Sequence, residues 1–234
     1  MQYFYSPDAN IGNILELDRE ESRHLIRSLR KKLNDKVHIT NGKGEVFEAT
    51  IVDDNMNSCI LNITNLVEAK FQTNYELHIA ISPLKSQDRF EWFVEKASEI
   101  GISSITPIKC VRSEKTNIKI ERLERIALSA MKQSLKTKLP TINELTDFEE
   151  FISAQTDDFN KFIAWCETDK EELFSNMEIG KKTLILIGPE GDFTNEEVEM
   201  AVKKGFKPIS LGQSRFRTET AAVLACHTVF LANQ

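Results

Sequence analysis

Two glycine-containing stretches near the C-terminus have the composition of ligand-binding turns. The stretch Ile187–Gly191 follows the apolar run Thr183–Ile187, and Leu211–Ala221 follows a second apolar run and holds two arginines. Glycine lets a backbone approach a ligand closely, and ligands of parallel sheets bind beyond the carboxyl ends of the strands. Two such turns together favour a shared pocket. The residues alone name no ligand, and turns that need glycine only for their geometry are the alternative.

The second part of the chain must position these turns, and its pattern predicts a parallel sheet. Apolar strands alternate with amphipathic helices, which is typical of a sheet covered on both faces. Thr194 followed by Glu197 has the spacing of a capping box, and Thr218 or Thr220 could cap the last helix. The expected strands are Tyr75–Ser82, Ser104–Lys109, Phe162–Cys166, Thr183–Ile187 and Pro208–Leu211, and the expected helices are Gln87–Ile100, Ile120–Leu135, Phe148–Ser153, Asn195–Lys204 and Glu219–Leu231.

The first part of the chain predicts a small β-barrel that carries one basic helix. The helix begins after Asp18, a capping residue, and continues through Arg23–Lys32. Its spacing places Arg23, Arg27 and Arg30 on one face. The pattern changes near residues 68–76, which predicts one domain over residues 1–70 and another over 74–234. The expected strands are Gln2–Tyr5, Asn13–Leu17, Lys36–Thr40, Glu45–Val52 and Cys59–Leu66.

The net charge of −6 argues against a nucleic-acid partner until its distribution is considered. Arg23–Lys36 holds six basic residues and one acid, whereas Glu144–Glu178 holds eleven acids and two lysines. A local basic patch is what meets phosphates. The alternative is an ordinary solvated helix. The candidate RNA contacts are Arg23, Arg27, Arg30, Lys31, Lys85, Arg89 and Arg112.

Several function classes lack their characteristic motifs. The four cysteines and four histidines are scattered without metal-ligand spacing, so no metal site is expected. The P-loop, dinucleotide-binding and serine-hydrolase signatures are absent from the sequence. No apolar run reaches the length of a membrane span, and Met1–Pro7 does not begin a signal peptide. A cytoplasmic location without membrane contact is therefore expected.

The order of the motifs resembles a known family. Gly188-Pro189-Glu190-Gly191, followed by Leu211-Gly212 and Arg217-Thr218-Glu219-Thr220-Ala221, is similar to the SPOUT class of methyltransferases. More closely, it resembles the ribosomal small subunit methyltransferase E family, which methylates N3 of a uridine in 16S rRNA, at position 1498 in the usual rRNA numbering. The resemblance extends over the whole chain through His24–Arg30, Asp88–Trp92, Glu95–Gly101, Gln133-Ser134 and Leu139-Pro140.

The resemblance implies a fold, a cofactor and partners. The fold would be a PUA-like N-terminal β-barrel followed by an α/β domain with a C-terminal trefoil knot. The partners would be the 16S rRNA of the small ribosomal subunit and a second copy of the chain in a homodimer. S-adenosylmethionine would lie in the knot, with help from a loop after Phe162–Cys166. Its expected contacts are Ile187, Gly188, Pro189, Glu190, Gly191, Leu211, Gly212, Phe216, Arg217 and Thr220.

Methylation of uridine N3 requires loss of a proton, stabilisation of the resulting anion and alignment with the methyl group. We expect Arg217 to stabilise the anion, and Glu219 to orient Arg217 or its loop. A structural ion pair between these two residues is the alternative. No side chain stands out as the general base, and solvent could take the proton.

Two departures from the family pattern bear on the pocket. Asp192 stands where the family often has a second glycine, and Ser214-Arg215-Phe216 stands where it often has Arg-Ile-Leu. Arg215 could therefore replace the usual arginine from a neighbouring position. Two other functions stay open. One is a SPOUT enzyme that acts on another base or a ribose 2′-hydroxyl, and the other is a non-catalytic RNA-binding assembly factor.

Overall fold

The computed structural model describes residues 2–69, 73–115, 117–166 and 172–234. The chain forms two compact units. The first comprises Met1–Gln72 together with Met131–Leu139, and the second comprises Thr73–Ala130 together with Pro140–Gln234. No sequence pattern indicated that Met131–Leu139 packs with the first unit.

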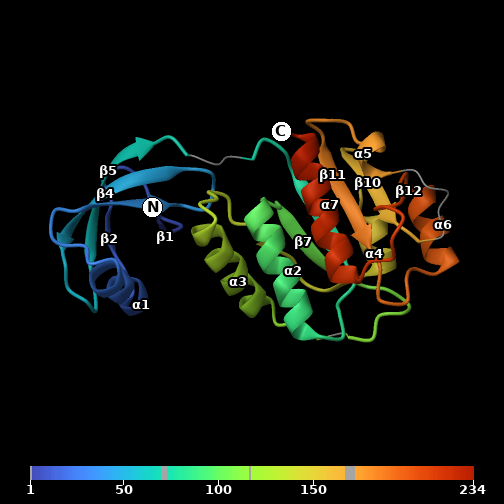
Figure 1. Ribbon diagram of the computed structural model, residues 1–234, viewed down its shortest axis with the longest axis horizontal. Helices are drawn as coiled ribbons and strands as arrows, with labels where there is room; N and C mark the ends of the chain where they lie inside the picture. Colours follow the sequence, from blue (N-terminus) through green and yellow to red (C-terminus); the bar gives the residue numbers. More distant parts are fainter. Residues whose placement is uncertain (1, 70–72, 116, 167–171) are drawn as a thin grey trace. The chain divides into compact units, whose positions relative to one another are not determined.

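The first unit is built on a five-stranded sheet in the order β1-β3-β4-β5-β2, and the sheet is curled (Figure 1). β1 runs parallel to β3, and the other neighbours are antiparallel. Its inner side holds buried apolar residues such as Phe4, Leu25, Ile39, Phe47 and Leu61. The predicted small β domain is confirmed. The strands are β1 (Tyr3–Tyr5), β2 (Ile14–Glu16), β3 (Lys36–Thr40), β4 (Val46–Asp53) and β5 (Ile60–Val67).

The added segment Met131–Leu139 is attached to the turn between β3 and β4. The Gly44 amide donates to the Thr137 carbonyl at 2.9 Å, and the Leu139 amide donates to the Gly42 carbonyl at 2.8 Å. The Thr40 hydroxyl donates to the same Thr137 carbonyl at 3.2 Å. These bonds satisfy main-chain groups that the turn would otherwise leave unpaired.

The basic helix is shorter than its pattern predicts. Asp18 caps it as expected, because its Oδ1 accepts the Glu21 amide at 2.8 Å. The helix runs as α1 (Arg19–Arg23) and continues as the π-helical turn η1 (His24–Ser28). Arg30 follows in a left-handed conformation, with φ 55°, and a right-handed helix cannot continue through such a residue. The expected extension to Lys32 is therefore wrong, and Arg30 does not share a helical face with Arg23 and Arg27.

The second unit confirms the predicted parallel sheet. Seven strands run parallel, six of them in the order β12-β10-β11-β6-β7-β8, and β9 pairs with β7. The short elements β8, β9 and α5 were not predicted, because so few residues carry no periodic pattern. The strands are β6 (Leu77–Ile81), β7 (Ser104–Lys109), β8 (Thr141–Ile142), β9 (Thr146–Asp147), β10 (Phe159–Ala164), β11 (Lys182–Ile187) and β12 (Lys207–Ile209). The helices are α2 (Gln87–Ile100), α3 (Ile120–Gln133), α4 (Phe148–Ser153), α5 (Leu173–Asn176), α6 (Asn195–Lys203) and α7 (Thr218–Ala232).

Helices cover both faces of this sheet. Successive strand residues point to opposite faces, so Leu184 and Leu186 of β11 share one face. They pack in a cluster with Phe151 of α4 and Val198 of α6. α7 packs against β6, β11 and α2, and Figure 1 shows α7 and α2 side by side in front of the strands. Because β11 is buried on both sides, it is apolar throughout its last four residues.

α6 and α7 both begin close to the carboxyl ends of strands, but their N-caps differ. Thr194 and Glu197 form the predicted capping box at the start of α6. The expected cap of α7 by Thr218 or Thr220 is wrong, because α7 begins one residue earlier than predicted. Arg217 is its N-cap and makes no capping bond with its side chain. Within the described residues, no helix is long and apolar enough to cross a membrane.

Candidate active site

A cavity of about 890 Å³ lies at the carboxyl ends of β10, β11 and β12. Because these three strands are neighbours in the sheet, the loops that follow them meet although they are far apart in the sequence. They are the two glycine-containing loops and the third loop that the resemblance implied. The lining residues from these loops are Ala164, Trp165 and Cys166; Ile187, Gly188, Pro189, Glu190, Gly191, Asp192 and Phe193; and Ile209, Ser210, Leu211, Gly212, Gln213, Ser214, Arg215, Phe216, Arg217 and Thr218.

The structure brings most of the expected donor contacts to this cavity and leaves other expected residues elsewhere. Thr220, on α7, is not among the lining residues. Arg89 and Arg112, expected as RNA contacts, line the cavity. Lys85 pairs instead with Glu114 at 3.1 Å, and both side chains are exposed. The remaining expected RNA contacts belong to the first unit, where Arg23, Arg27 and Arg30 are exposed and Lys31 is half-buried.

The loop after β11 depends on a close packing contact. A Cβ at Gly188 would lie 3.0 Å from Cδ2 of Phe193, and Phe193 is a buried core residue. Real Cβ atoms seldom come so close to a neighbouring atom. A larger residue here would require the Phe193 ring to shift by a few tenths of an ångström, so glycine favours the close packing of the loop over the phenyl ring.

Asp192 fits this loop in spite of the departure from the family pattern. Its φ is 62°, a left-handed conformation that favours glycine and that aspartate adopts more readily than most residues. Its Oδ1 accepts the Phe193 amide at 2.8 Å, and its Oδ2 accepts the Cys166 amide at 3.1 Å. The aspartate thus keeps a glycine-like backbone and adds a link to the loop after β10.

Arg112 donates hydrogen bonds to main-chain carbonyls of the same loop. Its Nη1 donates to the Gly191 carbonyl at 2.6 Å and lies 3.4 Å from the Phe193 carbonyl. Glu197 of α6 accepts the amides of Val111 and Thr194 at 2.8 and 2.9 Å. Arg112 was expected only as an RNA contact, and no local pattern could have indicated a partner 79 residues away.

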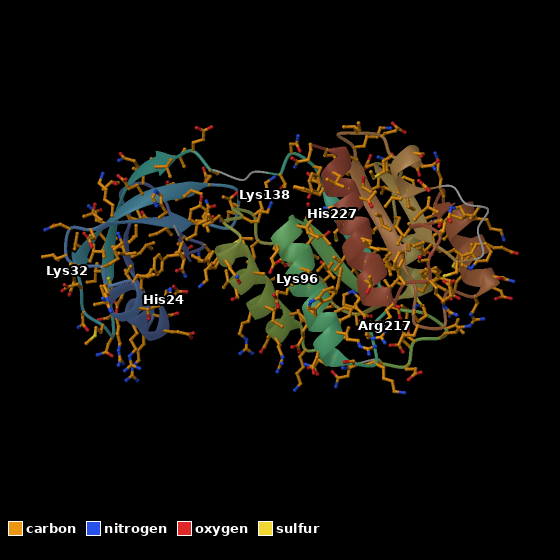
Figure 2. The ribbon with its side chains drawn as sticks, in the orientation of Figure 1. His24, Lys32, Lys96, Lys138, Arg217 and His227 are labelled. Atoms are coloured by element: carbon orange, nitrogen blue, oxygen red, sulfur yellow. The ribbon has the colours of Figure 1, made fainter. Side chains whose placement is uncertain are left out.

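The loop after β12 is more open. Gly212 has φ 127°, which a residue with a side chain adopts rarely, and the Ser210 hydroxyl bonds both its amide and its carbonyl. Phe216 is 37% exposed, and both Arg215 and Arg217 line the cavity. Figure 2 shows Arg217 at the end of α7 where that helix begins.

Glu219 does not pair with Arg217. Its side chain is 8% exposed, and its Oε1 lies 3.7 Å from Nε of Arg89. Among the described residues, Arg217 makes no ion pair with Glu219. The carboxylate expected to orient Arg217 therefore belongs, in this structure, to a pair between α7 and α2.

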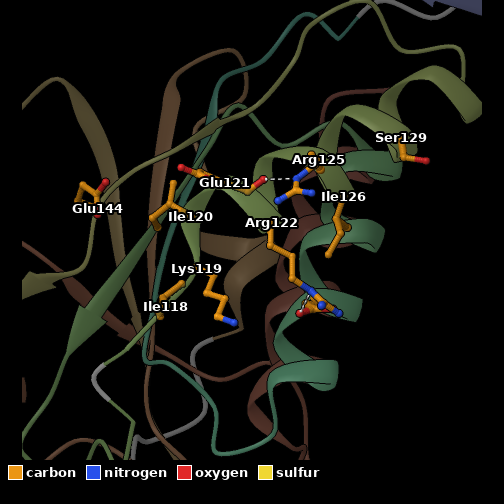
Figure 3. A pocket seen from close by; sticks show the side chains of 10 residues that line it. Ile118, Lys119, Ile120, Glu121, Arg122, Arg125, Ile126, Ser129 and Glu144 are labelled. Carbon is orange, nitrogen blue, oxygen red and sulfur yellow. Dashed lines mark hydrogen bonds and ion pairs between the residues drawn. The ribbon is translucent and has the colours of Figure 1, made fainter. Parts of the chain in front are cut away.

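A second cavity, of about 820 Å³, lies beside α3 (Figure 3). Arg122 turns toward α2 and pairs with Glu91, with Nε 2.6 Å from Oε1. This bond lowers the pKa of the Glu91 carboxyl. None of the glycine-loop residues lines this cavity, and acidic and basic side chains are balanced in it. The cavity at the strand ends is therefore the candidate active site.

Three of the four cysteines are buried, and the fourth, Cys166, is exposed and lines the cavity. Burial raises the pKa of the Cys110 and Cys226 thiols, and a thiol is a nucleophile only as its anion. No group of three or more His, Cys, Asp or Glu side chains in this part could hold a metal ion.

Comparison with known proteins identifies the family. The model of the RNA methyltransferase domain matches residues 71–230, and the model of the RNA methyltransferase PUA domain matches residues 17–64. Ribosomal RNA small subunit methyltransferase E from Rickettsia conorii is 30% identical over 93% of this chain and 89% of its own length. The chain belongs to the ribosomal RNA small subunit methyltransferase E family.

Solved structures of other methyltransferases share the fold of this chain. A probable rRNA-methyltransferase from Porphyromonas gingivalis superposes with a TM-score of 0.91, at 38% identity, over 99% of both chains. A putative methyltransferase from Legionella pneumophila, in complex with bound S-adenosylmethionine, superposes with a TM-score of 0.86 at 25% identity, over 99% of this chain and 97% of that one. The α/β fold with a small N-terminal β domain is thus shared along the whole chain.

Proposed function

We propose that this protein transfers a methyl group from S-adenosylmethionine to N3 of a uridine in the 16S rRNA of the small ribosomal subunit. By family membership the uridine is position 1498. The observation that carries the proposal is the cavity at the ends of three parallel strands, which the family's two glycine-containing motifs line. An assembly factor without catalytic activity would not need this pocket.

The cavity suits the chemical groups of the methyl donor. Its volume of about 890 Å³ lies within the range of roughly 300–1,000 Å³ that is usual for small-molecule sites. Ile187, Ile209 and Leu211 supply apolar walls for the adenine ring. We assign the donor's polar groups to the main chain of the two glycine-containing loops and to Glu190. The bound donor supplies an electrophilic methyl group.

The protein's own residues must then hold the uracil and stabilise its charge. N3 becomes a nucleophile only when its proton leaves, and we assign that proton to solvent. Arg217 lines the cavity and is exposed, so its guanidinium is free to donate hydrogen bonds to the uracil anion. The loops align N3 with the methyl group, which lowers the entropic part of the barrier.

Mass spectrometry of rRNA from a deletion strain tests this function. We expect 16S rRNA from that strain to lack one methyl group on uridine N3, and the purified protein with S-adenosylmethionine to restore it. Unchanged rRNA would contradict the proposal. A methyl group missing instead from another base or from a ribose 2′-hydroxyl would favour a different SPOUT activity.

The Arg217→Ala variant tests the assignment of Arg217. We expect methyl transfer to fall by about 100-fold, because a fixed donor to a developing anion contributes about that much. The circular dichroism spectrum serves as the control for folding, because Arg217 is also an expected contact of the donor. A variant that binds donor and RNA normally and still methylates at the wild-type rate would refute the assignment.

We further propose that the first unit contacts RNA through Arg23, Arg27, Arg30 and Lys31, and that the protein acts in the cytoplasm, where its rRNA substrate is found. We also propose the trefoil knot that the family implies.

A homodimer is a further part of this proposal. Ten of the fifteen residues of α7 are apolar, and a helix that is apolar on several sides needs cover on each of them. Leu231 of α7 is nevertheless 54% exposed, and Trp92 of α2 is 42% exposed. Sedimentation at twice the chain mass of 26.7 kDa would support the dimer, and sedimentation at that mass would refute it.

A further inference from the structure

The start of α7 buries a carboxylate that is only partly paired. Glu219, the second residue of this helix, has an 8% exposed side chain. Its Oε2 is buried and has no hydrogen-bond partner among the described residues. Burial of an unpaired carboxylate is costly, and the positive end of a helix reduces that cost only in part. A cation beside the carboxylate reduces that cost further.

That cation is Arg89, in the first turn of α2. Its Nε lies 3.7 Å from Glu219 Oε1, which is close enough for an ion pair but beyond the usual length of a hydrogen bond. A guanidinium has five N–H donors, and the side chain of Arg89 is 42% exposed where it lines the candidate active site. The pair therefore keeps the charge of Arg89 beside the cavity, and its N–H donors stay available to a ligand.

The other cavity arginines are held differently. Arg112 has Nη1 engaged by the Gly191 carbonyl at 2.6 Å. Arg215 and Arg217 are exposed on the loop before α7, and the described part of the chain shows no ion pair for either. Among these arginines, Arg89 is the one that a buried carboxylate holds at the cavity. Fixed donors stabilise developing charge more than mobile ones, since they need no reorganisation during the reaction.

We propose that Arg89 is a catalytic residue that binds a carbonyl oxygen of the target uracil, and that Glu219 is the positioning residue that holds it there. The proposal rests on the proposed function and adds a second arginine to Arg217. When N3 loses its proton to solvent, the negative charge spreads over N3, O2 and O4, and Arg89 donates to one of these oxygens. The N3–CH3 bond forms as the S–CH3 bond breaks, and sulfur keeps the electron pair of the broken bond.

The test compares single-turnover methyl transfer to small-subunit RNA across a range of pH. For Arg89→Ala we expect the rate to fall by about 100-fold. We also expect the pH midpoint of the reaction to rise by about one unit, because removal of a nearby cation makes the uracil harder to deprotonate. Arg89→Lys should recover part of the rate. Donor affinity, measured by calorimetry, should not change, which also shows that the variant is folded.

Two substitutions test the role of Glu219: Glu219→Gln removes its charge, and Glu219→Asp keeps the charge on a shorter side chain. Glu219→Gln should raise the pH midpoint in the same direction, and Glu219→Asp should lie closer to wild type. The effects of Arg89→Ala and Glu219→Gln should not add in the double variant, because each substitution breaks the same ion pair. Lys96→Ala is the matched control, since Lys96 lies on the same helix in ion pairs with Glu95 and Glu99 and away from the cavity (Figure 2).

Three results would overturn the inference. Weaker donor binding by Arg89→Ala with an unchanged pH midpoint would make Arg89 a donor contact. A smaller salt dependence of RNA binding with an unchanged midpoint would make it a phosphate contact. A wild-type rate and midpoint would leave it no role in the reaction. Absence of methyl transfer by the wild-type protein would instead refute the proposed function, so the two failures are distinguishable.

Discussion

Two positions in one loop, Gly188 and Asp192, are under different structural constraints. At Gly188 the difficulty is space, because a Cβ would lie 3.0 Å from the Phe193 ring. At Asp192 the difficulty is backbone conformation, and the side chain offsets the strain of φ 62° by accepting two main-chain amides. A residue other than glycine therefore fits position 192 without a clash, whereas at position 188 it requires the Phe193 ring to shift.

Gly188→Ala should lower both stability and donor affinity. The added methyl group forces the buried Phe193 ring or the loop to move, and such overpacking costs about 1–3 kcal/mol of unfolding free energy. We expect donor affinity to fall by about tenfold, which corresponds to roughly 1.4 kcal/mol. Chemical denaturation and calorimetry measure the two effects.

Combining Gly188→Ala with Phe193→Leu tests whether the clash with Phe193 causes the loss of stability. The second substitution removes the ring atoms that the new methyl group meets, so the double variant should be more stable than the sum of the single effects indicates. Strictly additive effects would show that the contact with Phe193 is not the cause.

At the scale of elements, a polar cluster joins β6, β7 and the segment after β8. Nε2 of His78 lies 2.7 Å from Oγ1 of Thr106, and Asn143 Nδ2 donates to the same oxygen at 2.7 Å. Phe151 of α4 packs edge-on against the imidazole at 5.6 Å. Burial lowers the pKa of His78 from 6.5 to about 4. The strands are thus held together by a histidine that is neutral in the folded protein.

This histidine should make the stability depend on pH. The unfolded chain takes up a proton near pH 6.5, while the folded protein does so only near pH 4. The contribution of His78 is therefore complete above pH 6.5 and is lost as the pH falls toward 4. The loss should be on the order of 3 kcal/mol. Urea unfolding at several pH values measures it, and His78→Gln should flatten the curve in this interval. An identical pH dependence in both proteins would exclude His78 as the source.

At the scale of the whole molecule, the two units have different tasks in the proposed reaction. The exposed arginines of α1 and η1 belong to the first unit, whereas every residue that lines the candidate active site belongs to the second. The net charge of −6 does not prevent RNA binding, because phosphates respond to local charge. RNA affinity and donor affinity should therefore be separable by mutation.

The double variant Arg23→Ala/Arg27→Ala should weaken RNA binding and leave donor binding unchanged. Loss of two phosphate contacts should reduce the slope of log affinity against log salt by about 1.4 for single-stranded RNA. Filter binding at several salt concentrations measures the slope. Lys181→Ala/Lys182→Ala serves as the control, since these residues are at the opposite end of β11 from the cavity. An unchanged slope in the arginine variant would remove these two residues from the RNA contact.

Sequence alone was enough for the features that local pattern encodes. The apolar runs of β6, β7, β10 and β11 predicted a parallel sheet, and β12 was correctly placed before the second loop. The glycines at 188 and 212 indicated the two turns, and the motif order indicated the methyltransferase E family. Each of these features depends on residues that are close together in the chain. Such features can be predicted from the hydrophobic periodicity of the sequence and from the conformational preferences of its residues.

Features that depend on distant neighbours became known only from the folded chain. There the basic helix ends at Ser28, Met131–Leu139 packs with the first unit, and Arg112 donates to the Gly191 loop. Glu219 also pairs with Arg89 rather than with Arg217. The physical reason is the same in each case. Which charged side chain meets which partner is set by the packing of helices and loops against the sheet, and a one-dimensional pattern does not contain those distances.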